Sequence, residues 1–498
     1  MSRRTVPTAV LLDALEDKTV VGTPPATVSG LADDSRKVAP GDCFVAVPGL
    51  RQDGRRFIPE AVRRGAVLVI TEGAPPGDPP VPLVLVPSAR RALALAADAW
   101  FGHPSRHLTV VGITGTNGKT TTSYLVDALL QARGLRTGVI GTVQYRVGDE
   151  AVPAGQTTPE ALELQAMLAR MYTAGVRGVT MEVSSHALAL HRVDGLTLDA
   201  AVFTNLTQDH LDFHGTMDAY RRAKRRLFEL LARSPKPRRT AVVNADDPAG
   251  AEMVRGLDLP VVTFGLGAEA AVRPLVWRST LDGIELRAAT PAGPVALASP
   301  LIGEHNVMNL LAAIATGVAL GVPPDVLGPA LGRVQAVPGR FEQIRAGQPF
   351  LVVVDYAHTP DALERVLATA RRLVPGRLAV VFGCGGDRDR GKRPLMGEIA
   401  ARLADRVWVT SDNPRTEPPE AIIDAIMAGV RRVPGGEART VREADRRAAI
   451  RAALAWAEAG DGVVIAGKGH ETVQIVGDAV LPFDDRAVAR EALGARGA

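Results

Sequence analysis

Short runs of apolar residues alternate along the chain with longer stretches in which apolar residues recur every three or four positions. The short runs predict buried strands, and the longer periodic stretches predict helices. Regular alternation of the two is typical of α/β folds with mainly parallel sheets. Strands are expected at 43–47, 66–71, 83–86, 108–114, 178–183, 200–204, 240–244, 351–355, 378–383, 407–410 and 462–467. Helices are expected, among others, at 56–65, 88–101, 219–231 and 309–320.

Two breaks divide this pattern into three regions. The stretch HPSRH near 103–107 separates residues 1–105 from 106–335, and the loop AVPGRFE at 336–342 opens region 336–498. We therefore expect an α/β fold of three domains: a smaller N-terminal α/β domain, a central domain with a mainly parallel sheet, and a C-terminal doubly wound, Rossmann-like domain. In such sheets ligands bind at the carboxyl ends of the strands.

Composition narrows the class of protein. A chain of 498 residues with 46% hydrophobic and 22% charged residues is typical of a globular protein with two or three domains. A net charge of +4 and only 11 Phe, 5 Tyr and 4 Trp argue against nucleic-acid binding and favour a small anionic substrate.

The cysteines and the apolar segments point to the cytoplasm. Cys43 and Cys384 lie in different expected domains, so neither a disulfide scaffold nor a cysteine metal site is expected. Asp13 and Glu16 interrupt the first apolar run too early for a secretory signal, and the run 309–322 is too short to span a bilayer. We expect a soluble, cytoplasmic protein without membrane insertion.

The strongest chemical signal is the stretch LTVVGITGTNGKTTTSYLVDALL at 108–130. A strand leads into a glycine-rich loop, and a Gly-Lys-Thr triplet opens a helix. Backbone N–H groups and the positive helix end would cradle phosphates, with Lys119 on the β and γ phosphates and the Thr120 hydroxyl on Mg²⁺. Ile113 stands where the usual loop has glycine, so the loop is a variant. An ordinary glycine-rich turn is the alternative; nucleotide binding is favoured, which leaves kinase, ligase, motor and switch open.

Polar residues gather after two further strands of the central region. EVSSHAL follows one strand with Glu182, and FTNLTQDHLDFHG follows the next with His210. Glu182 and His210 could hold Mg²⁺ against the γ-phosphate. His186 and His214, taken singly, are better explained as surface or cap residues. The helix at 219–231 has a strongly basic face, and on spacing alone Lys224 belongs to an ordinary charged helix surface.

Several motifs together give a more specific picture. In order, the chain carries TGTNGKTTT, EVSSHAL, FTNLTQDHLDFHG, YRRAKRRLF, GEHNVMN, PGRFE, DYAHTPDAL, GGDRDRGKRP and SDNPR. With these it resembles, essentially end to end, the Mur ligases, the ATP-dependent amino-acid ligases of peptidoglycan precursor synthesis. The resemblance implies a UDP-sugar domain, a central ATPase and a C-terminal amino-acid domain, in agreement with the breaks above.

The resemblance also implies roles for individual residues. ATP would bind Gly115, Thr116, Asn117, Gly118, Lys119, Thr120, Thr121, Asn306 and Arg340. The UDP-MurNAc-dipeptide would bind Ser35, Thr157, Thr158, Ser184, Arg192 and the loop 50–52, where Leu-Arg-Gln replaces a common His-Gln pair. Diaminopimelate would bind Arg388, Asp412, Asn413, Pro414, Arg415, Gly467 and Glu471. Lys119, Glu182, His210 and Lys224 would be catalytic, and two Mg²⁺ ions would be held by Thr120, Glu182, His210 and Lys224, the last carbamylated by CO₂.

The activity implied is the ATP-dependent joining of meso-2,6-diaminopimelate to the D-glutamyl γ-carboxylate of UDP-MurNAc-L-Ala-D-Glu by a monomeric enzyme. The carboxylate would take the γ-phosphoryl group, and the amine would then displace phosphate through a tetrahedral intermediate, in a site closed to water. Domain closure would bring the amino-acid domain onto the ATPase.

The stretch VWVTSDNPRTEPP at 407–419 bears on which amino acid is added. Arg415 offers a planar guanidinium to a distal carboxylate, Asp412 and Asn413 suit the far zwitterionic centre, and Pro414 fixes the backbone between them. An Asx turn stopped by proline is the ordinary alternative. Beside GGDRD and GKGHE at neighbouring strand ends, diaminopimelate binding is favoured.

Other functions remain open on the sequence alone. An L-lysine-adding relative has related motifs. The segment DSRKV at 34–38 and the DNPR motif disfavour a folylpolyglutamate synthase or another Mur ligase. A P-loop kinase or a non-catalytic nucleotide switch would be of a different class.

Overall fold

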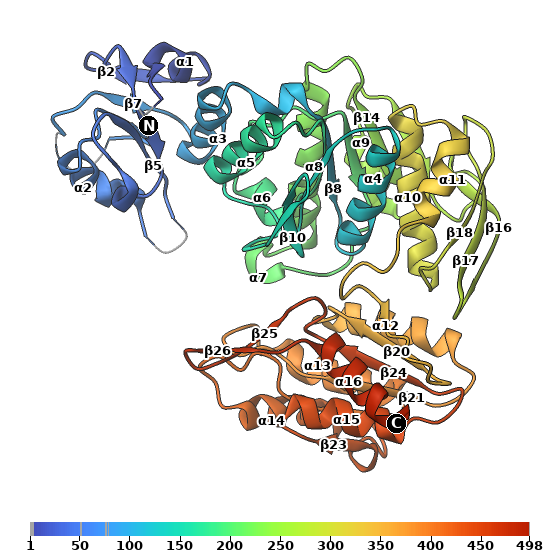
Figure 1. Cartoon of the computed structure of the whole chain (residues 1–498). Helices are drawn as coiled ribbons and strands as arrows, with labels where there is room; N and C mark the ends of the chain where they lie inside the picture. Colours follow the sequence, from blue (N-terminus) through green and yellow to red (C-terminus); the bar gives the residue numbers. More distant parts are fainter. Residues whose placement is uncertain (1–3, 50–51, 75–76, 78, 498) are drawn as a thin grey trace.

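The computed structural model describes residues 4–49, 52–74, 77 and 79–497. They form three α/β units, with the middle unit beside the N-terminal unit and above the C-terminal unit in the view of Figure 1. The expected fold class, a three-domain α/β protein with mainly parallel sheets, is confirmed. Within the described ranges, every helix is too short or too polar to cross a bilayer.

The N-terminal unit is built on a sheet in the order β2-β7-β6-β5-β4, parallel except for β2. Helix α3 packs alanine-rich surface against β5 and β6, and the same hydrophobic cluster includes Ala161 of the middle unit. The elements are β1 (Val6–Pro7), α1 (Thr8–Asp13), β2 (Thr19–Val21), β3 (Thr27–Val28), β4 (Gly30–Ala32), β5 (Asp42–Ala46), α2 (Ile58–Arg63), β6 (Leu68–Thr71), β7 (Leu83–Leu85) and α3 (Ala89–Trp100).

The middle unit has a sheet in the order β11-β10-β9-β12-β8-β13-β14-β15. From β9 to β15 the neighbours are parallel, whereas β10 and β11 add an antiparallel hairpin. The elements are β8 (Thr109–Thr114), α4 (Lys119–Ala132), β9 (Thr137–Ile140), β10 (Gln144–Val147), β11 (Glu150–Pro153), α5 (Ala161–Thr173), β12 (Gly178–Glu182), α6 (Ser185–Ala189), β13 (Ala200–Phe203), α7 (Leu211–His214), α8 (Met217–Arg233), β14 (Thr240–Asn244), α9 (Pro248–Val254) and β15 (Val261–Phe264). Strand β8 lies between β12 and β13, so the glycine-rich loop that follows it is flanked by both polar strand ends.

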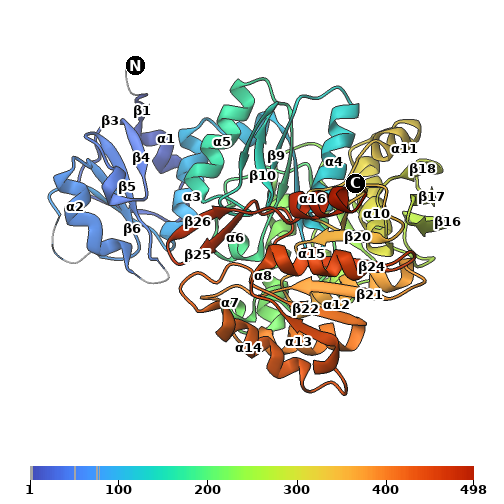
Figure 2. The ribbon, with the colours of Figure 1, turned by 60° about the horizontal axis from the view of Figure 1, so that its bottom comes forward.

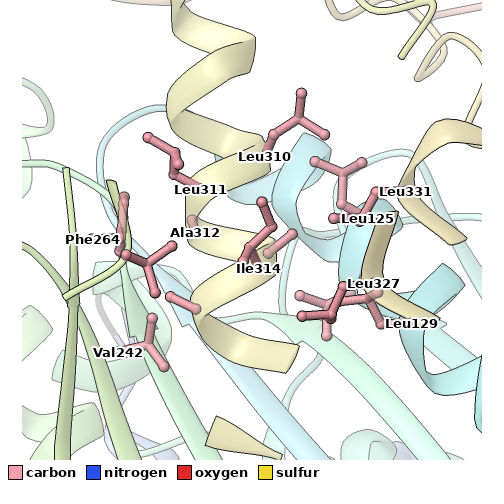
Figure 3. Packing of buried hydrophobic residues seen from close by; sticks show 14 of the residues in the cluster. Leu125, Leu129, Val242, Phe264, Leu310, Leu311, Ala312, Ile314, Leu327 and Leu331 are labelled. Carbon is pink, nitrogen blue, oxygen red and sulfur yellow. The ribbon is translucent and has the colours of Figure 1, made fainter. Parts of the chain in front are cut away.

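An antiparallel sheet, β16-β17-β18, completes the middle unit and was not among the expected strands. Its strands are β16 (Arg273–Thr280), β17 (Gly283–Ala289) and β18 (Val295–Ser299), and helices α10 (Glu304–Ala319) and α11 (Pro324–Gly332) follow. The apolar run seen in the sequence is α10, whose residues lie at the centre of the core. Figure 3 shows α10 between Leu125, Leu129 and Leu327 on one side and Val242 and Phe264 on the other.

The C-terminal unit has a sheet in the order β19-β20-β24-β21-β22-β23, parallel except for β19. The elements are β19 (Glu342–Gln343), β20 (Leu351–Asp355), α12 (Pro360–Leu373), β21 (Leu378–Phe382), α13 (Lys392–Leu403), β22 (Arg406–Val409), α14 (Pro419–Val430), β23 (Thr440–Arg442), α15 (Arg446–Trp456), β24 (Gly462–Ala466), β25 (Val473–Val476), β26 (Ala479–Pro482) and α16 (Asp485–Gly497). The hairpin β25–β26 leaves this sheet and extends towards the side of the N-terminal unit in Figures 1 and 2.

Helices α13 and α14 pack so closely that glycine is required between them. A Cβ atom on Gly429 would overlap the carbonyl oxygen of Pro394, which is backbone and cannot rotate away. We expect Gly429→Ala to lower the free energy of unfolding by about 1–3 kcal/mol, the usual cost of overpacking. Thermal unfolding of the full chain measures this change.

The matched control is Gly494→Ala, because Gly494 lies in α16 with open space around its Cβ position. Alanine there should stabilise the chain by about 0.5–1 kcal/mol, since it removes backbone freedom from the unfolded state. Equal effects of the two substitutions would contradict the steric argument.

Candidate active site

The loop between β8 and α4 has the geometry of a phosphate-binding loop. Gly118 has a φ of +84°, and a side chain there would meet the Oδ1 atom of Asn309. The Nζ atom of Lys119 donates to the carbonyl oxygens of Gly115 and Thr116 at 2.9 and 2.8 Å. The lysine thus folds back over the loop, at the N-terminus of a helix that attracts anions.

The end of β13 holds the other side of this loop. Asn205 accepts a hydrogen bond from the backbone N–H of Asn117 at 2.9 Å, and the Thr204 hydroxyl donates to the Asn117 carbonyl at 2.6 Å. The Thr116 hydroxyl meets the Tyr220 hydroxyl at 3.2 Å. These contacts fix the loop before any ligand arrives.

Glu182 lies directly behind the loop, at the end of β12. It is buried, with 1% of its surface exposed, and its Oε2 atom accepts from the Thr120 hydroxyl at 3.0 Å. Thr142 donates to the same carboxylate through its backbone N–H at 2.7 Å and its hydroxyl at 3.0 Å. The structure therefore places the Thr120 hydroxyl and the Glu182 carboxylate, both expected as metal ligands, next to each other.

Lys224 is not on the exposed face of α8, as its spacing alone suggested; this expectation was wrong. Only 1% of its surface is exposed, and its Nζ atom donates to the Gly115 carbonyl oxygen at 2.7 Å and lies 4.3 Å from the centre of the Tyr220 ring. Burial is the main cause that holds the pKa of Lys224 well below its ordinary value, and the positive charge of nearby Lys119 adds to it. This lysine is buried beside the phosphate loop, 109 positions away in sequence.

Three histidines surround the same corner. The ring of His186 lies 4.7 Å from that of His210 and 5.6 Å from that of His214, and the Nε2 atom of His214 lies 3.0 Å from the Ser185 hydroxyl. Burial lowers the pKa of His210, and it lowers that of His186 to about 4, where neighbouring His210 adds to the effect. Burial therefore favours the neutral form of His186 and His210.

Among the described residues, no group of three or more His, Cys, Asp or Glu side chains is arranged to hold a metal ion by itself. Magnesium in phosphoryl-transfer sites, however, is bound by one or two carboxylates together with waters and substrate phosphates. The buried carboxylate of Glu182 and the hydroxyl of Thr120 fit that kind of site.

A cleft of about 980 Å³ runs from the phosphate loop to the C-terminal unit. Arg340, Asp355 and His358 line it from the C-terminal side, and the Arg340 guanidinium stacks 4.7 Å from the centre of the Tyr356 ring. Expected residue Asn306 is buried; its amide donates to the carbonyl of Ile302, just before α10, and accepts from the amide of Asn309 within it. The lining of the cleft from this helix includes His305, Met308 and Asn309.

One carboxylate from the C-terminal unit reaches the phosphate loop directly. The Oδ2 atom of Asp361 accepts from the Asn117 amide at 3.2 Å and from the Thr207 hydroxyl at 3.0 Å. Sequence reasoning missed this residue, although it lies in the motif DYAHTPDAL. The two units are thus in contact across the cleft at the loop itself.

The expected residues for the acyl substrate meet beside Glu182. The Thr157 hydroxyl lies 3.1 Å from that of Thr142, and the Thr158 hydroxyl accepts from the Ser184 N–H at 3.1 Å. Arg192 donates to the Thr158 carbonyl at 3.0 Å and pairs with Glu160 at 2.6 Å. Thr157, Thr158, Ser184 and Arg192 therefore form one patch next to the phosphate loop.

Ser35 lies in the N-terminal unit, where it begins a short 3-10 helix. Its hydroxyl donates to the Oε2 atom of Glu60 at 2.8 Å, and 6% of its surface is exposed. Of the neighbouring loop 50–52, which was expected to share this role, residues 50 and 51 lie outside the described residues.

The expected amino-acid residues come together at the carboxyl ends of β22 and β24. Asn413 donates to the Oε2 atom of Glu471 at 2.8 Å, and a Cβ atom on Gly467 would lie 2.6 Å from the Oδ2 atom of Asp412. Arg415 has a φ of +51° and donates through Nη1 to the Gly386 carbonyl at 2.8 Å.

Neighbouring segments complete and fix this loop. Arg388 and Arg415 approach the same glycine from two loops: a Cβ atom on Gly385 would lie 3.0 Å from Nη1 of Arg415 and 3.7 Å from Cγ of Arg388. Hairpin β25–β26 holds the loop from outside: the Arg415 N–H donates to the Ile475 carbonyl at 3.1 Å, and the Gly477 N–H donates to the Arg415 carbonyl at 2.7 Å.

A buried lysine, which sequence reasoning missed, lies at the centre of this group. The side chain of Lys468 is 0% exposed, and its Nζ atom donates to Asn413 Oδ1 and Glu471 Oε2, both at 3.0 Å. The signal was present in GKGHE, where a lysine directly follows a buried strand. Lys468 fixes the orientation of both polar side chains.

Comparisons with known proteins agree with this geometry. Three family models match: the Mur ligase middle domain at residues 113–317, the Mur ligase glutamate ligase domain at 339–469, and the Mur ligase family catalytic domain at 27–101. A UDP-N-acetylmuramoyl-L-alanyl-D-glutamate–2,6-diaminopimelate ligase of Solibacter usitatus is 50% identical, over 94% of this chain and 93% of that protein. The protein of the same name from Geobacillus kaustophilus is 48% identical, over 93% and 94%. A solved structure of a ligase with this name superposes with a TM-score of 0.72 at 35% identity, over 99% of this chain and 100% of that one.

Proposed function

This chain belongs to the Mur ligase family, and we propose that it joins meso-2,6-diaminopimelate to the D-glutamyl γ-carboxylate of UDP-MurNAc-L-Ala-D-Glu, with conversion of ATP to ADP and phosphate. The resemblance inferred from the motifs is thereby confirmed, and the chain is an ATP-dependent, amide-forming ligase of peptidoglycan precursor synthesis. Membership of this family decides against a P-loop kinase or a nucleotide switch. The observation that carries the proposal is the near full-length match to ligases of this name.

The reaction must make a carboxylate reactive towards an amine. We propose that ATP lies in the cleft with its phosphates on the loop 115–121, where Lys119 and the N-terminus of α4 neutralise negative charge. A γ-carboxylate oxygen bonds to the γ-phosphorus while the bond to ADP breaks, which gives an acyl phosphate. The amine then attacks the acyl carbon, loses a proton, and expels inorganic phosphate.

The residues at the loop also fit Mg²⁺. Thr120, Glu182 and His210 would hold it, with Lys224 as a carbamate, and two ions are proposed. Bound Mg²⁺ neutralises charge on the transferring phosphoryl group. The support for a carbamate is that Lys224 is buried with a lowered pKa, because only a neutral amine reacts with CO₂. As a carbamate this side chain would present anionic oxygen atoms rather than an ammonium beside the loop.

The two organic substrates would approach from either side of the phosphates. We assign UDP-MurNAc-L-Ala-D-Glu to Ser35 in the N-terminal unit and to Thr157, Thr158, Ser184 and Arg192, which lie next to Glu182. Diaminopimelate is assigned to the residues at the ends of β22 and β24. Domains at 1–105, 106–335 and 336–498, and a monomeric enzyme without nucleic-acid partners, remain part of the proposal.

The choice of amino acid rests on Arg415. Its side chain is half-buried and its backbone is fixed by the β25–β26 hairpin, so its guanidinium can pair with a distal carboxylate at little cost in conformational entropy. L-Lysine lacks that carboxylate and would leave the Arg415 guanidinium without its proposed anion.

The function is tested by one ligation assay with meso-diaminopimelate, L-lysine and ornithine in competition, read by product mass. The product carrying diaminopimelate is expected to dominate. Dominance of the lysine product would overturn the amino-acid assignment, and release of phosphate without added amine would overturn the ligase mechanism.

We expect Arg415→Ala to raise the KM for diaminopimelate by about 10- to 100-fold, the usual value of a hydrogen bond to a charged group. The KM for ATP should stay within about twofold, because the hydrogen bonds of Arg415 are to Gly386, Ile475 and Gly477 and not to the phosphate loop. Steady-state kinetics with each substrate varied in turn measures both values. Arg390→Ala is the control, since Arg390 is 75% exposed and, among the described residues, its side chain forms one ion pair, with Glu417. Unchanged diaminopimelate kinetics in Arg415→Ala would contradict the assignment.

A further inference from the structure

A fully buried ion pair lies directly beneath the proposed amino-acid site. Arg446 is the first residue of α15 and Asp485 the first of α16, and both side chains are 0% exposed. The guanidinium binds the carboxylate with two parallel hydrogen bonds of 2.7 Å, Nε to Oδ1 and Nη2 to Oδ2. The pair joins the C-terminal helix to the rest of the unit.

The remaining donors of Arg446 reach two strand ends. Its Nη2 atom donates to the carbonyl of Ala466 at 2.9 Å, and its Nη1 atom donates to the carbonyl of Ser411 at 3.4 Å. Ala466 ends β24 and is followed by Gly467; Ser411 follows β22 and is followed by Asp412. One planar side chain therefore binds the backbone immediately before each of the two loops that carry the site.

These two strands are not neighbours, because β21 lies between them in the sheet. Both pair with β21, but the paired residues end at Val409 of β22 and Ile465 of β24, so the sheet fixes the strands and not the loops beyond them. After β21, Gly383 lies so close to the loop that follows β22 that a Cβ atom there would overlap the backbone of Thr410 and Asp412. Asn413 of one loop is bonded to Glu471 of the other.

Stability alone does not explain such a pair. Removing two charges from water costs several kcal/mol each, and well-packed apolar residues of similar volume often replace a buried pair without loss of stability. The distinctive property of this arrangement is its geometry. The guanidinium has five N–H donors in one plane, and its four hydrogen bonds hold the two loops at a fixed separation.

We propose that Arg446 is a positioning residue for the amino-acid site, and that Asp485, and with it helix α16, is part of the same device. Arg446 sets the separation of the loop 411–415 from the loop 467–471, so that groups from both loops can bind one amino acid. The proposal rests on the function proposed above for these loops.

The test uses Arg446→Met combined with Asp485→Leu in the full chain, so that no unpaired charge is buried. We expect a melting temperature within a few degrees of the unsubstituted chain, a KM for the amino acid raised at least about 10-fold, and a KM for ATP changed less than about twofold. Arg446→Lys keeps the charge but loses the planar guanidinium. It should also raise the KM for the amino acid while leaving the KM for ATP nearly unchanged, and it provides the test if the double variant does not fold.

Glu491→Gln is the matched control, because Glu491 joins the same two helices through Arg447 and Arg451 at the exposed surface. It should leave both KM values unchanged. Unchanged amino-acid KM in the double variant and in Arg446→Lys, or an equal rise of both KM values, would overturn the proposal.

Hydrogen–deuterium exchange without substrates separates this proposal from the assigned function. Amides of 411–415 and 467–471 should exchange faster in the double variant and in Arg446→Lys, and not in Glu491→Gln. Protection equal to that of the unsubstituted chain would refute the positioning role whichever amino acid the enzyme accepts. Preference for lysine in the competition assay would refute only the substrate assignment.

Discussion

Lys119→Met is expected to lower kcat by about 10³-fold, equivalent to about 4 kcal/mol of transition-state stabilisation. The Lys119 ammonium donates hydrogen bonds to the carbonyls of Gly115 and Thr116, at the start of α4, where phosphates would be bound. Charge on the transferring phosphoryl group grows in the transition state, and methionine offers similar volume without a cation. Single-turnover formation of ADP, measured with saturating ATP, isolates this step from product release.

Lys236→Met is the control for a lysine lost from the same unit. Lys236 pairs with Asp199 at 2.6 Å and is 8% exposed, at the opposite end of β8 from the loop. The Lys236→Met variant should have a lower melting temperature than the unsubstituted chain and a nearly unchanged kcat below that temperature. A kcat for Lys119→Met within about tenfold of the unsubstituted enzyme would exclude the proposed role.

Lys224→Ala is expected to lower kcat by about 10²- to 10³-fold, because it removes the side chain proposed to supply an anionic oxygen for Mg²⁺. The unsubstituted enzyme should lose activity in CO₂-free buffer and regain it with bicarbonate. The variant should respond to neither treatment. Initial rates at several bicarbonate concentrations, with intact mass of the protein to detect a carbamate, measure both expectations.

Arg222→Ala on the same helix is the control, since Arg222 is 64% exposed and pairs only with Asp218. It should keep the full rate and the bicarbonate response. Full activity of Lys224→Ala would refute the carbamate, and so would a rate of the unsubstituted enzyme that is independent of CO₂.

Local sequence was sufficient where function follows from neighbouring residues. The strand, glycine turn and helix of the phosphate loop are contiguous, so their geometry could be predicted from the order of residues 108–130. The same holds for the loop after β22, because Asp412, Asn413 and Arg415 are adjacent. Antiparallel strands β16 to β18 were not foreseen. Strand β16 is partly exposed along its length and has an irregular register, but β17 alternates buried and exposed residues, so this part of the signal was present in the sequence.

Burial was the main property that sequence reasoning judged wrongly. Lys224 falls within the stripe formed by Tyr220, Ala223, Leu227 and Phe228, which is the buried face of α8. That spacing was available in the sequence, but a lysine on such a stripe usually extends its ammonium into water. The chain packs it against Gly115 instead, and only the tertiary structure excludes water from it.

The sequence by itself determined the α/β class, the phosphate loop and the ordered motifs of the family, because each depends on residues close together in the chain. Tertiary structure alone placed Asp361 against Asn117 from 244 positions away and Arg446 under two strands that are not neighbours. It also showed that Lys224 is buried on the Gly115 carbonyl, where the family resemblance had implied only its role. The physical reason is that the pKa of a buried amine and the spacing of two loops depend on which surfaces meet, and chain order does not encode that locally.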